Sequence, residues 1–174
     1  MKHIVVIELL LLIFISCSNF FYNDRGDESI MLINRSERVL ASFPADEFRT
    51  GFSYPDTLPT LYNPPMMLRQ HIVDSAYVLS YGGCSWREAL SLTKSGRISI
   101  YLLSQDVIDN YSWEEISTTP YYLVRYDLTI KDLNEGLHYI YYPPTDEMKD
   151  IYMYPDIETV ITQSTSVLHP KEEY

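Results

Sequence analysis

The fold is decided by residues 85–128, which read SWREALSLTKSGRISIYLLSQDVIDNYSWEEISTTPYYLVRYDL. A short helix followed by a strand occurs twice in this stretch. Ser85 and Ser112 each stand before a tryptophan and three residues before a glutamate, which is the spacing of a capping box at a helix start. Residues 97–103 and 121–128, which follow the two helices, are rich in apolar and β-branched side chains and predict strands. The stretch therefore predicts short helices packed against a sheet.

Further strands are predicted before this stretch. Residues 30–33 and 39–43 each alternate in the manner of a strand, and the turn-forming residues 34–37 lie between them. We therefore expect the first two strands to form a hairpin. Another strand is predicted over residues 75–81, whereas the prolines within residues 44–67 exclude a regular strand there.

A third helix and a last strand are predicted after it. Thr129 and Asp132 form another capping box before a helix over residues 130–134, and Gly136 is placed to end that helix. Residues 137–142 predict a strand. Together the elements predict an α+β fold, with a mainly antiparallel sheet and two or three short helices on one face. An all-β sandwich with helical turns is the alternative.

The N-terminus has the pattern of an export signal. A basic start is followed by an apolar run over residues 4–15, interrupted only by Glu8, and by Ser16 and Cys17. The run is shorter than the roughly 20 apolar residues that a membrane-spanning helix needs. Residues Phe14-Ile15-Ser16-Cys17 resemble the lipobox of bacterial lipoprotein signal peptides. A plain signal peptide and a retained N-terminal anchor are the alternatives.

The lipobox resemblance implies cleavage before Cys17 and a diacylglycerol on its sulfur, which would anchor the protein to a membrane. Residues 1–16 are then the signal peptide and residues 17–28 a lipidated tether. Ser18 is not the aspartate that commonly retains lipoproteins in an inner membrane, and the first acid after the cysteine is Asp24. We therefore expect the outer membrane, with the domain facing the periplasm rather than the cell surface.

The remaining chain is expected to hold one α+β domain over residues 29–144 and a polar, partly disordered tail over residues 145–174. Its segment order resembles a group of Bacteroidetes-type lipoproteins that has no assigned activity. The residues that carry this resemblance include Tyr54-Pro55-Asp56-Thr57, Leu123-Val124-Arg125-Tyr126-Asp127-Leu128-Thr129 and Tyr141-Tyr142-Pro143-Pro144. The resemblance implies a class and a compartment.

Charge and cysteine content exclude several functions. The formal net charge is −11, so the chain is not expected to bind nucleic acid or anionic lipid headgroups. If Cys17 carries lipid, Cys84 is the only other cysteine and no internal disulfide forms. Residues 82–86 resemble a papain-type motif, but Ser85 separates the cysteine from the aromatic residue. We interpret Cys84 as structural.

No catalytic, metal or cofactor site is predicted. His71 and Asp74 are the candidates for a metal site or a catalytic pair. However, no two histidines stand at metal-ligand spacing. The acidic neighbours 114–115 and 146–147 are interpreted as solvated surface. The sequence therefore favours a non-catalytic interaction or accessory module over an enzyme. The alternative is an envelope hydrolase with an Asp/Glu–His site.

The chain is rich in tyrosine, with 16 in 174 residues. Residues 121–122 and 139–142 place rings on both faces of the predicted strands. Two interpretations are therefore open: the rings pack within the sheet, or some of them form an exposed aromatic patch for a protein or glycan partner. Trp113 is expected to be largely buried where helix meets sheet. Thr57 and Ser75 each follow an aspartate and precede an apolar residue, which resembles the O-glycosylation acceptor of Bacteroidetes proteins.

Overall fold

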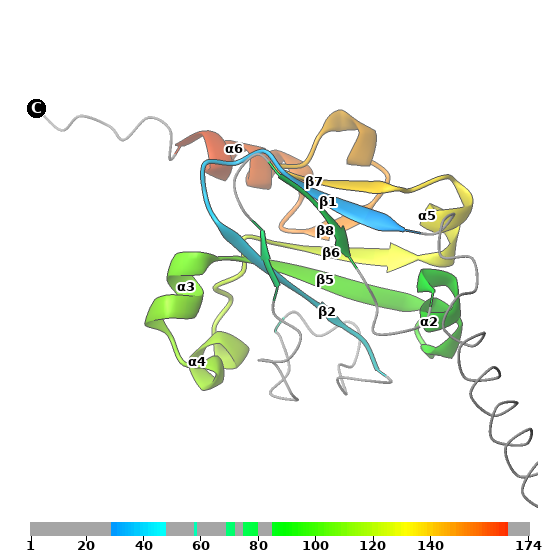
Figure 1. Cartoon of the computed structure of the whole chain (residues 1–174), viewed down its shortest axis with the longest axis horizontal. Helices are drawn as coiled ribbons and strands as arrows, with labels where there is room; N and C mark the ends of the chain where they lie inside the picture. Colours follow the sequence, from blue (N-terminus) through cyan, green and yellow to red (C-terminus); the bar gives the residue numbers. More distant parts are fainter. Residues whose placement is uncertain (1–28, 48–57, 59–68, 72–74, 80–84, 167–174) are drawn as a thin grey trace, which may run out of the picture.

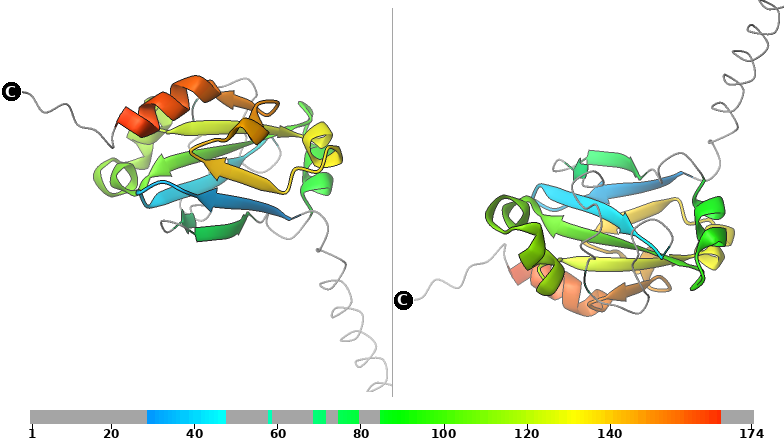
Figure 2. Two further views of the ribbon diagram at one scale, coloured as in Figure 1. Left: turned by 90° about the horizontal axis from the view of Figure 1, so that it is seen from above. Right: turned by 90° about the horizontal axis from the view of Figure 1, so that it is seen from below.

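The computed structural model describes residues 29–47, 58, 69–71, 75–79 and 85–166. In these residues, two β-sheets stack with an apolar core between them (Figures 1 and 2). The α+β class with mainly antiparallel strands is confirmed. The signal peptide, the tether with Cys17, Thr57, Asp74 and Cys84 lie outside the described residues.

The larger sheet has five strands in the order β3-β2-β5-β6-β8, and every neighbouring pair is antiparallel. Its strands are β2 (Leu40–Ala45), β3 (Arg69–His71), β5 (Arg97–Ser104), β6 (Val124–Thr129) and β8 (Tyr152–Tyr154). The central pair, β5 and β6, corresponds to the two strands predicted within residues 85–128. Along these strands, alternate residues face either the core or the outer surface of the sheet.

The smaller sheet has three strands, β4 (Ser75–Leu79), β1 (Ile30–Asn34) and β7 (Tyr139–Tyr142). Strand β1 lies between an antiparallel β4 and a parallel β7. The predicted hairpin of the first two strands is therefore wrong, because β1 and β2 belong to different sheets. The side chain of the buried Asn34 accepts a hydrogen bond from the Ser36 N–H (3.0 Å) and donates one to the Arg38 carbonyl (2.7 Å), so it directs the chain between the sheets.

The core fills the space between the inner faces of the two sheets. Ile30, Leu32 and Ile140 contribute from the smaller sheet, and Ile100 and Val124 are among the contributors from the larger one. Two polar contacts cross this core. The Trp86 Nε1–H donates to the Leu79 carbonyl (2.9 Å), and the Tyr126 hydroxyl donates to the Tyr141 carbonyl (2.8 Å).

The helices are short and lie around the sheets rather than between them (Figure 1). They are α2 (Trp86–Leu92), α3 (Gln105–Asn110), α4 (Trp113–Thr118), α5 (Ile130–Asn134), the 3₁₀ turn η2 (Asp146–Met148) and α6 (Ile157–Ser166). The capping boxes predicted at Ser112 and Thr129 are confirmed, and Ser85 caps α2. Gly136 follows α5 with φ of +86°, a conformation that favours glycine.

The predicted tail from residue 145 is wrong for residues 145–166. Strand β8 pairs with β6 and completes the larger sheet, and α6 buries Val160 in the core. Met148, Ile151 and Met153 are also buried there. The apolar residues of this segment are sparse, but Ile157 also packs against the core, so the polar average composition of the segment concealed its core positions.

The burial of Trp113 differs from the expectation. Trp86 is buried, at 3% exposure, whereas Trp113 is only half-buried. Trp113 packs its edge against Phe43, with ring centroids 5.2 Å apart. Helix α4 covers one end of the outer face of the larger sheet and does not enter the main core, because that core is already closed by the smaller sheet.

Candidate functional site

The outer face of the three-stranded sheet exposes apolar and aromatic side chains. In the strand register, Met31 lies between Val78 and Tyr139, and Ile33 lies between the neighbouring Ala76 and Tyr141. We call these six residues the outer aromatic face. Val78 is 53% exposed and Tyr139 is 49% exposed. The neighbours Ile140 and Tyr142 point to the core, so alternation along β7 separates a buried from an exposed set.

The tyrosine rings of this face lie next to a cation. Tyr139 and Tyr141 stack with centroids 6.3 Å apart, and the Arg35 guanidinium carbon lies 4.4 Å from the centroid of Tyr141. A guanidinium over an aromatic ring is held by the negative electrostatic potential of the ring face. Tyr141 is therefore partly covered by the chain itself, while Tyr139 presents its ring to solvent.

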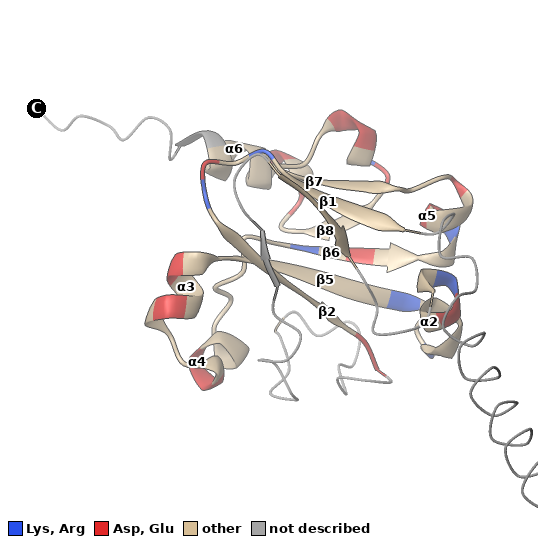
Figure 3. Cartoon of the chain, viewed as in Figure 1, with Lys and Arg blue, Asp and Glu red and all other residues tan. Residues whose placement is uncertain are grey.

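An open pocket of about 280 Å³ lies beside β7, between the end of α5 and η2. Met148, Ile151 and Leu137 provide apolar lining, and the walls include Tyr139 and Tyr141 of the outer aromatic face. The lining also includes His138 and four acidic residues, Asp132, Glu135, Glu147 and Asp150. We call this pocket the acidic groove. Figure 3 shows acidic residues at α5 and around η2.

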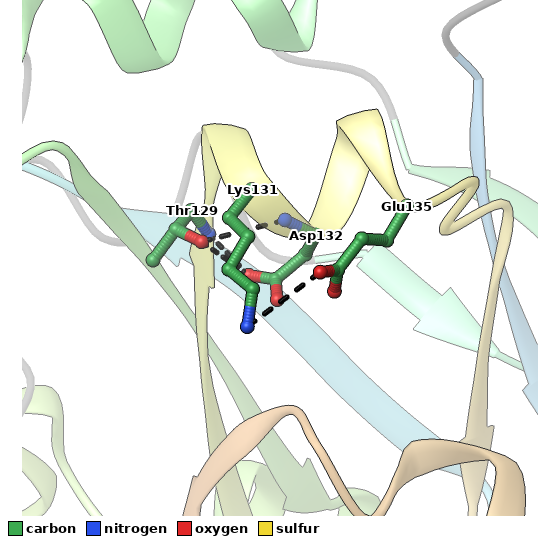
Figure 4. Close-up of polar contacts among 4 residues, drawn as sticks. All are labelled: Thr129, Lys131, Asp132 and Glu135. Atoms are coloured by element: carbon green, nitrogen blue, oxygen red, sulfur yellow. Dashed lines mark hydrogen bonds and ion pairs between the residues drawn. The ribbon is translucent and has the colours of Figure 1, made fainter.

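Two of the four carboxylates already have partners (Figure 4). Asp132 accepts hydrogen bonds from the Thr129 N–H (2.6 Å) and hydroxyl (2.7 Å) as part of the cap of α5. The Lys131 Nζ lies 3.6 Å from Glu135 Oε1 on the exposed side of the helix. Glu147 and Asp150 form no ion pair within the described part of the chain. The groove therefore keeps an excess of negative charge.

The outer face of the five-stranded sheet buries a charged pair instead. Arg125 and Asp127, two residues apart on β6, are 2% and 0% exposed, with Nη2 and Oδ2 2.8 Å apart. The Ser99 hydroxyl donates to Asp127 Oδ1 at 2.6 Å from the neighbouring strand. Burial raises the pKa of the Asp127 carboxyl, and the contacts with Ser99 and Arg125 oppose that rise.

Two tyrosines flank the buried pair. Burial raises the pKa of Tyr122 to about 12 and that of Tyr101 further, although Arg125 lowers both. Phe43 stacks on Tyr101 at 5.0 Å, and Leu58 packs against the same cluster. Both phenols are neutral near pH 7, and Asp127 is closed to solvent. The cluster is therefore suited to holding the strands of the larger sheet together.

The structure brings few of the sequence-predicted site residues together. Ser75 lies opposite the buried Asn34 in the β1–β4 ladder and is partly buried, on the face that points to the core. His71 pairs with Leu40 in the β2–β3 ladder. O-glycosylation at Ser75 and Thr57 stays a prediction, as does lipidation of Cys17.

Sequence reasoning missed the buried pair and the acidic groove. A signal for the pair existed, since Arg125 and Asp127 are separated by two positions within an apolar strand and must share one face. The groove had no comparable signal. Glu147 and Asp150 come from a segment that was interpreted as a tail, and only the folding of η2 places them beside β7.

No family model, curated protein or solved structure matches the chain. Among the described residues, no group of three or more His, Cys, Asp or Glu side chains is placed to hold a metal ion. No helix in the described ranges is long and apolar enough to cross a membrane.

Proposed function

We propose that the chain is a membrane-anchored lipoprotein of the bacterial cell envelope whose folded domain is a non-catalytic interaction module. The observation that carries this proposal is the outer aromatic face, where Val78 and Tyr139 are about half exposed beside Met31 and Ile33. Contiguous exposed apolar patches on soluble domains commonly mark interaction sites. Tyrosine adds rigid contact area at a small cost in side-chain entropy.

An envelope hydrolase with an Asp/Glu–His site is the second candidate. It is favoured only by His138, which lines the acidic groove together with four carboxylates. Within the described residues, His138 makes no ion pair with any of them. A binding role needs only the exposed surface, so it requires fewer additional assumptions.

The anchor is proposed to be a lipid on Cys17, which holds the domain at the outer membrane and facing the periplasm. Cys17→Ser should leave the protein without labelled fatty acid and either unprocessed or released from membranes. Equal labelling of the variant would contradict the anchor. Rapid loss of the protein from intact cells treated with an external protease would contradict the periplasmic orientation.

The interaction role can be tested by photo-crosslinking in intact cells. A benzoylphenylalanine at Val78 should give discrete adducts, because this position lies on the outer aromatic face. The same probe at Glu114, an exposed position on α4, is the matched control and should give none of them. Tyr139→Ser should weaken the Val78 adducts without unfolding the domain. Identical adduct patterns at both positions, or no adducts at Val78, would contradict a specific interaction surface.

A further inference from the structure

We propose that the acidic groove, with Tyr139 at its wall, binds a basic segment of a partner protein by accepting an arginine or lysine side chain. This inference rests on the proposed function and names the chemistry of the partner. It concerns the pocket between α5, β7 and η2, which adjoins the outer aromatic face through Tyr139 and Tyr141.

The lining of the groove fits a long cationic side chain. Of its apolar lining, Met148 and Ile151 are buried in the core, and the half-buried Leu137 can cover part of the aliphatic stem, which arginine and lysine bury readily while their charge stays near water. The exposed ring of Tyr139 offers a face for a cation–π contact. Within the chain, Arg35 already makes such a contact with the stacked neighbour Tyr141, at 4.4 Å.

The acidic residues of the groove differ in whether they have partners within the chain. Asp132 is engaged by Thr129, and Glu135 by Lys131, as Figure 4 shows. Glu147 and Asp150 are exposed, and neither forms an ion pair among the described residues, although Lys149 lies between them in the chain. A guanidinium or ammonium group in the groove could donate a charge-assisted hydrogen bond to either carboxylate.

The same charge disfavours the other occupants of an aromatic surface. A second copy of this chain would bring a net charge of −11 toward the same carboxylates. Anionic lipid headgroups would be repelled for the same reason. A neutral glycan could stack on Tyr139, but it would leave the charges of Glu147 and Asp150 without a counterpart. A basic protein segment is the occupant that uses both the ring and the carboxylates.

A titration with a defined probe tests this assignment. The full lipidated chain in neutral dodecyl maltoside micelles is titrated with tri-arginine amide, followed by ligand-observed NMR, and tri-citrulline amide serves as the neutral isostere. We expect saturable binding of tri-arginine and about fivefold or more weaker binding of tri-citrulline. Binding of both peptides with equal affinity would overturn the proposal, because the positive charge would then be irrelevant.

Paired variants separate the groove from the net charge. Glu147→Gln/Asp150→Asn should weaken tri-arginine binding about fivefold or more, because both free carboxylates of the groove are lost. Glu88→Gln/Glu114→Gln changes the net charge by the same amount at exposed sites on α2 and α4 and should leave the affinity within about twofold. Circular dichroism checks that each variant is folded.

Two further outcomes of the titration would overturn the proposal. Equal weakening by the two double variants would show general attraction to an acidic protein and would overturn it. Absence of saturable tri-arginine binding would overturn it as well. In that case specific photo-crosslinks at Val78 would still support an interaction module, so failure of the basic-partner inference and failure of the proposed function remain distinguishable.

Discussion

The three-stranded sheet turns Val78 and Tyr139 toward solvent, whereas the five-stranded sheet keeps the charged Arg125 and Asp127 buried on its own outer face. Both arrangements reverse the usual partition, in which apolar groups are buried and charges are solvated. The difference separates two roles. Exposed rings remain available to a partner. A buried ion pair has a desolvation penalty, but it constrains how neighbouring strands can pair.

The reason for the difference is what covers each face. Phe43, Leu58 and Ile116 pack over the outer face of the larger sheet, with α3 and α4 at one end. In the part of the chain that the structure describes, no helix crosses the outer face of the smaller sheet, as the view from above in Figure 2 shows. Its strands are therefore half-covered, with only their inner face in the core.

The largest expected effect concerns β8 and α6, which complete the sheet that carries the buried pair. Ending the chain after Pro144 removes Met148, Ile151, Met153 and Val160 from the core. Each fully buried apolar side chain contributes about 1.5–3 kcal/mol, and a typical domain is stable by only about 5–15 kcal/mol. We expect the truncated chain to lose cooperative unfolding in urea, followed by circular dichroism.

The matched control for this truncation ends after Ser166, which keeps both β8 and α6. This shorter deletion should preserve a cooperative transition. A cooperative transition in the chain ending at Pro144 would mean that the larger sheet is stable without its edge strand, and the contrast between the two sheets would lose its basis.

The next largest effect on stability is expected from removing the charges of the buried pair. Arg125→Leu leaves Asp127 buried without its cation and should lower the free energy of unfolding by about 3–5 kcal/mol. Arg125→Leu/Asp127→Leu removes both charges and should cost clearly less, since replacing a whole buried pair by apolar residues is often neutral. Urea denaturation of both variants measures the difference. A double variant less stable than the single one would indicate that the pair stabilises the sheet in its own right.

A smaller effect on stability should distinguish two buried tyrosines, of which only one donates a hydrogen bond between the sheets. The Tyr126 hydroxyl donates to the Tyr141 carbonyl and links the larger sheet to the smaller one, so Tyr126→Phe should cost about 1–3 kcal/mol. The Tyr122 hydroxyl has no hydrogen-bond partner among the described residues, so Tyr122→Phe should change stability by less than about 0.5 kcal/mol. Equal costs in thermal or urea unfolding would contradict the assignment of the inter-sheet link.

The smallest expected effect is a pH dependence from the buried carboxyl. The pKa of Asp127 is raised by burial above its ordinary value of 3.8, so the folded chain holds this proton to a higher pH than the unfolded chain. The contribution of Asp127 to the free energy of unfolding is fully present below that ordinary value. It is lost as the pH rises through the pKa of the folded state. The stability advantage of the wild type over Asp127→Asn should therefore shrink as the pH rises above 3.8. A growing advantage would mean that Arg125 outweighs the burial.

Local chemistry made several elements predictable. The capping boxes at Ser112 and Thr129 satisfy backbone groups within one turn, and Gly136 ends α5 because few other residues adopt its φ. Strands β5 and β6 follow from runs of β-favouring residues. The exposure of Tyr139 and burial of Tyr142 follow from their opposite places in the alternation of β7.

Non-local pairing made the remainder inaccessible to local patterns. Strands β1 and β2 look like a hairpin, but β1 instead pairs with β7, more than 100 residues later in the chain. Likewise, β8 joins the larger sheet from a segment whose composition is polar. Which strands pair depends on which surfaces meet in the folded chain. Turn residues such as Asn34 allow the preceding strand more than one pairing partner.

The sequence by itself therefore determined the α+β class, the helix caps and the expectation of a lipid on Cys17, because these depend on neighbours a few residues apart. Only the tertiary structure decided that the strands divide between two sheets and that Arg125 and Asp127 are buried. It also decided that Glu147 and Asp150 meet Tyr139 in one groove. These features depend on contacts between distant segments, whose free energy is set by packing in the folded state rather than by local preference.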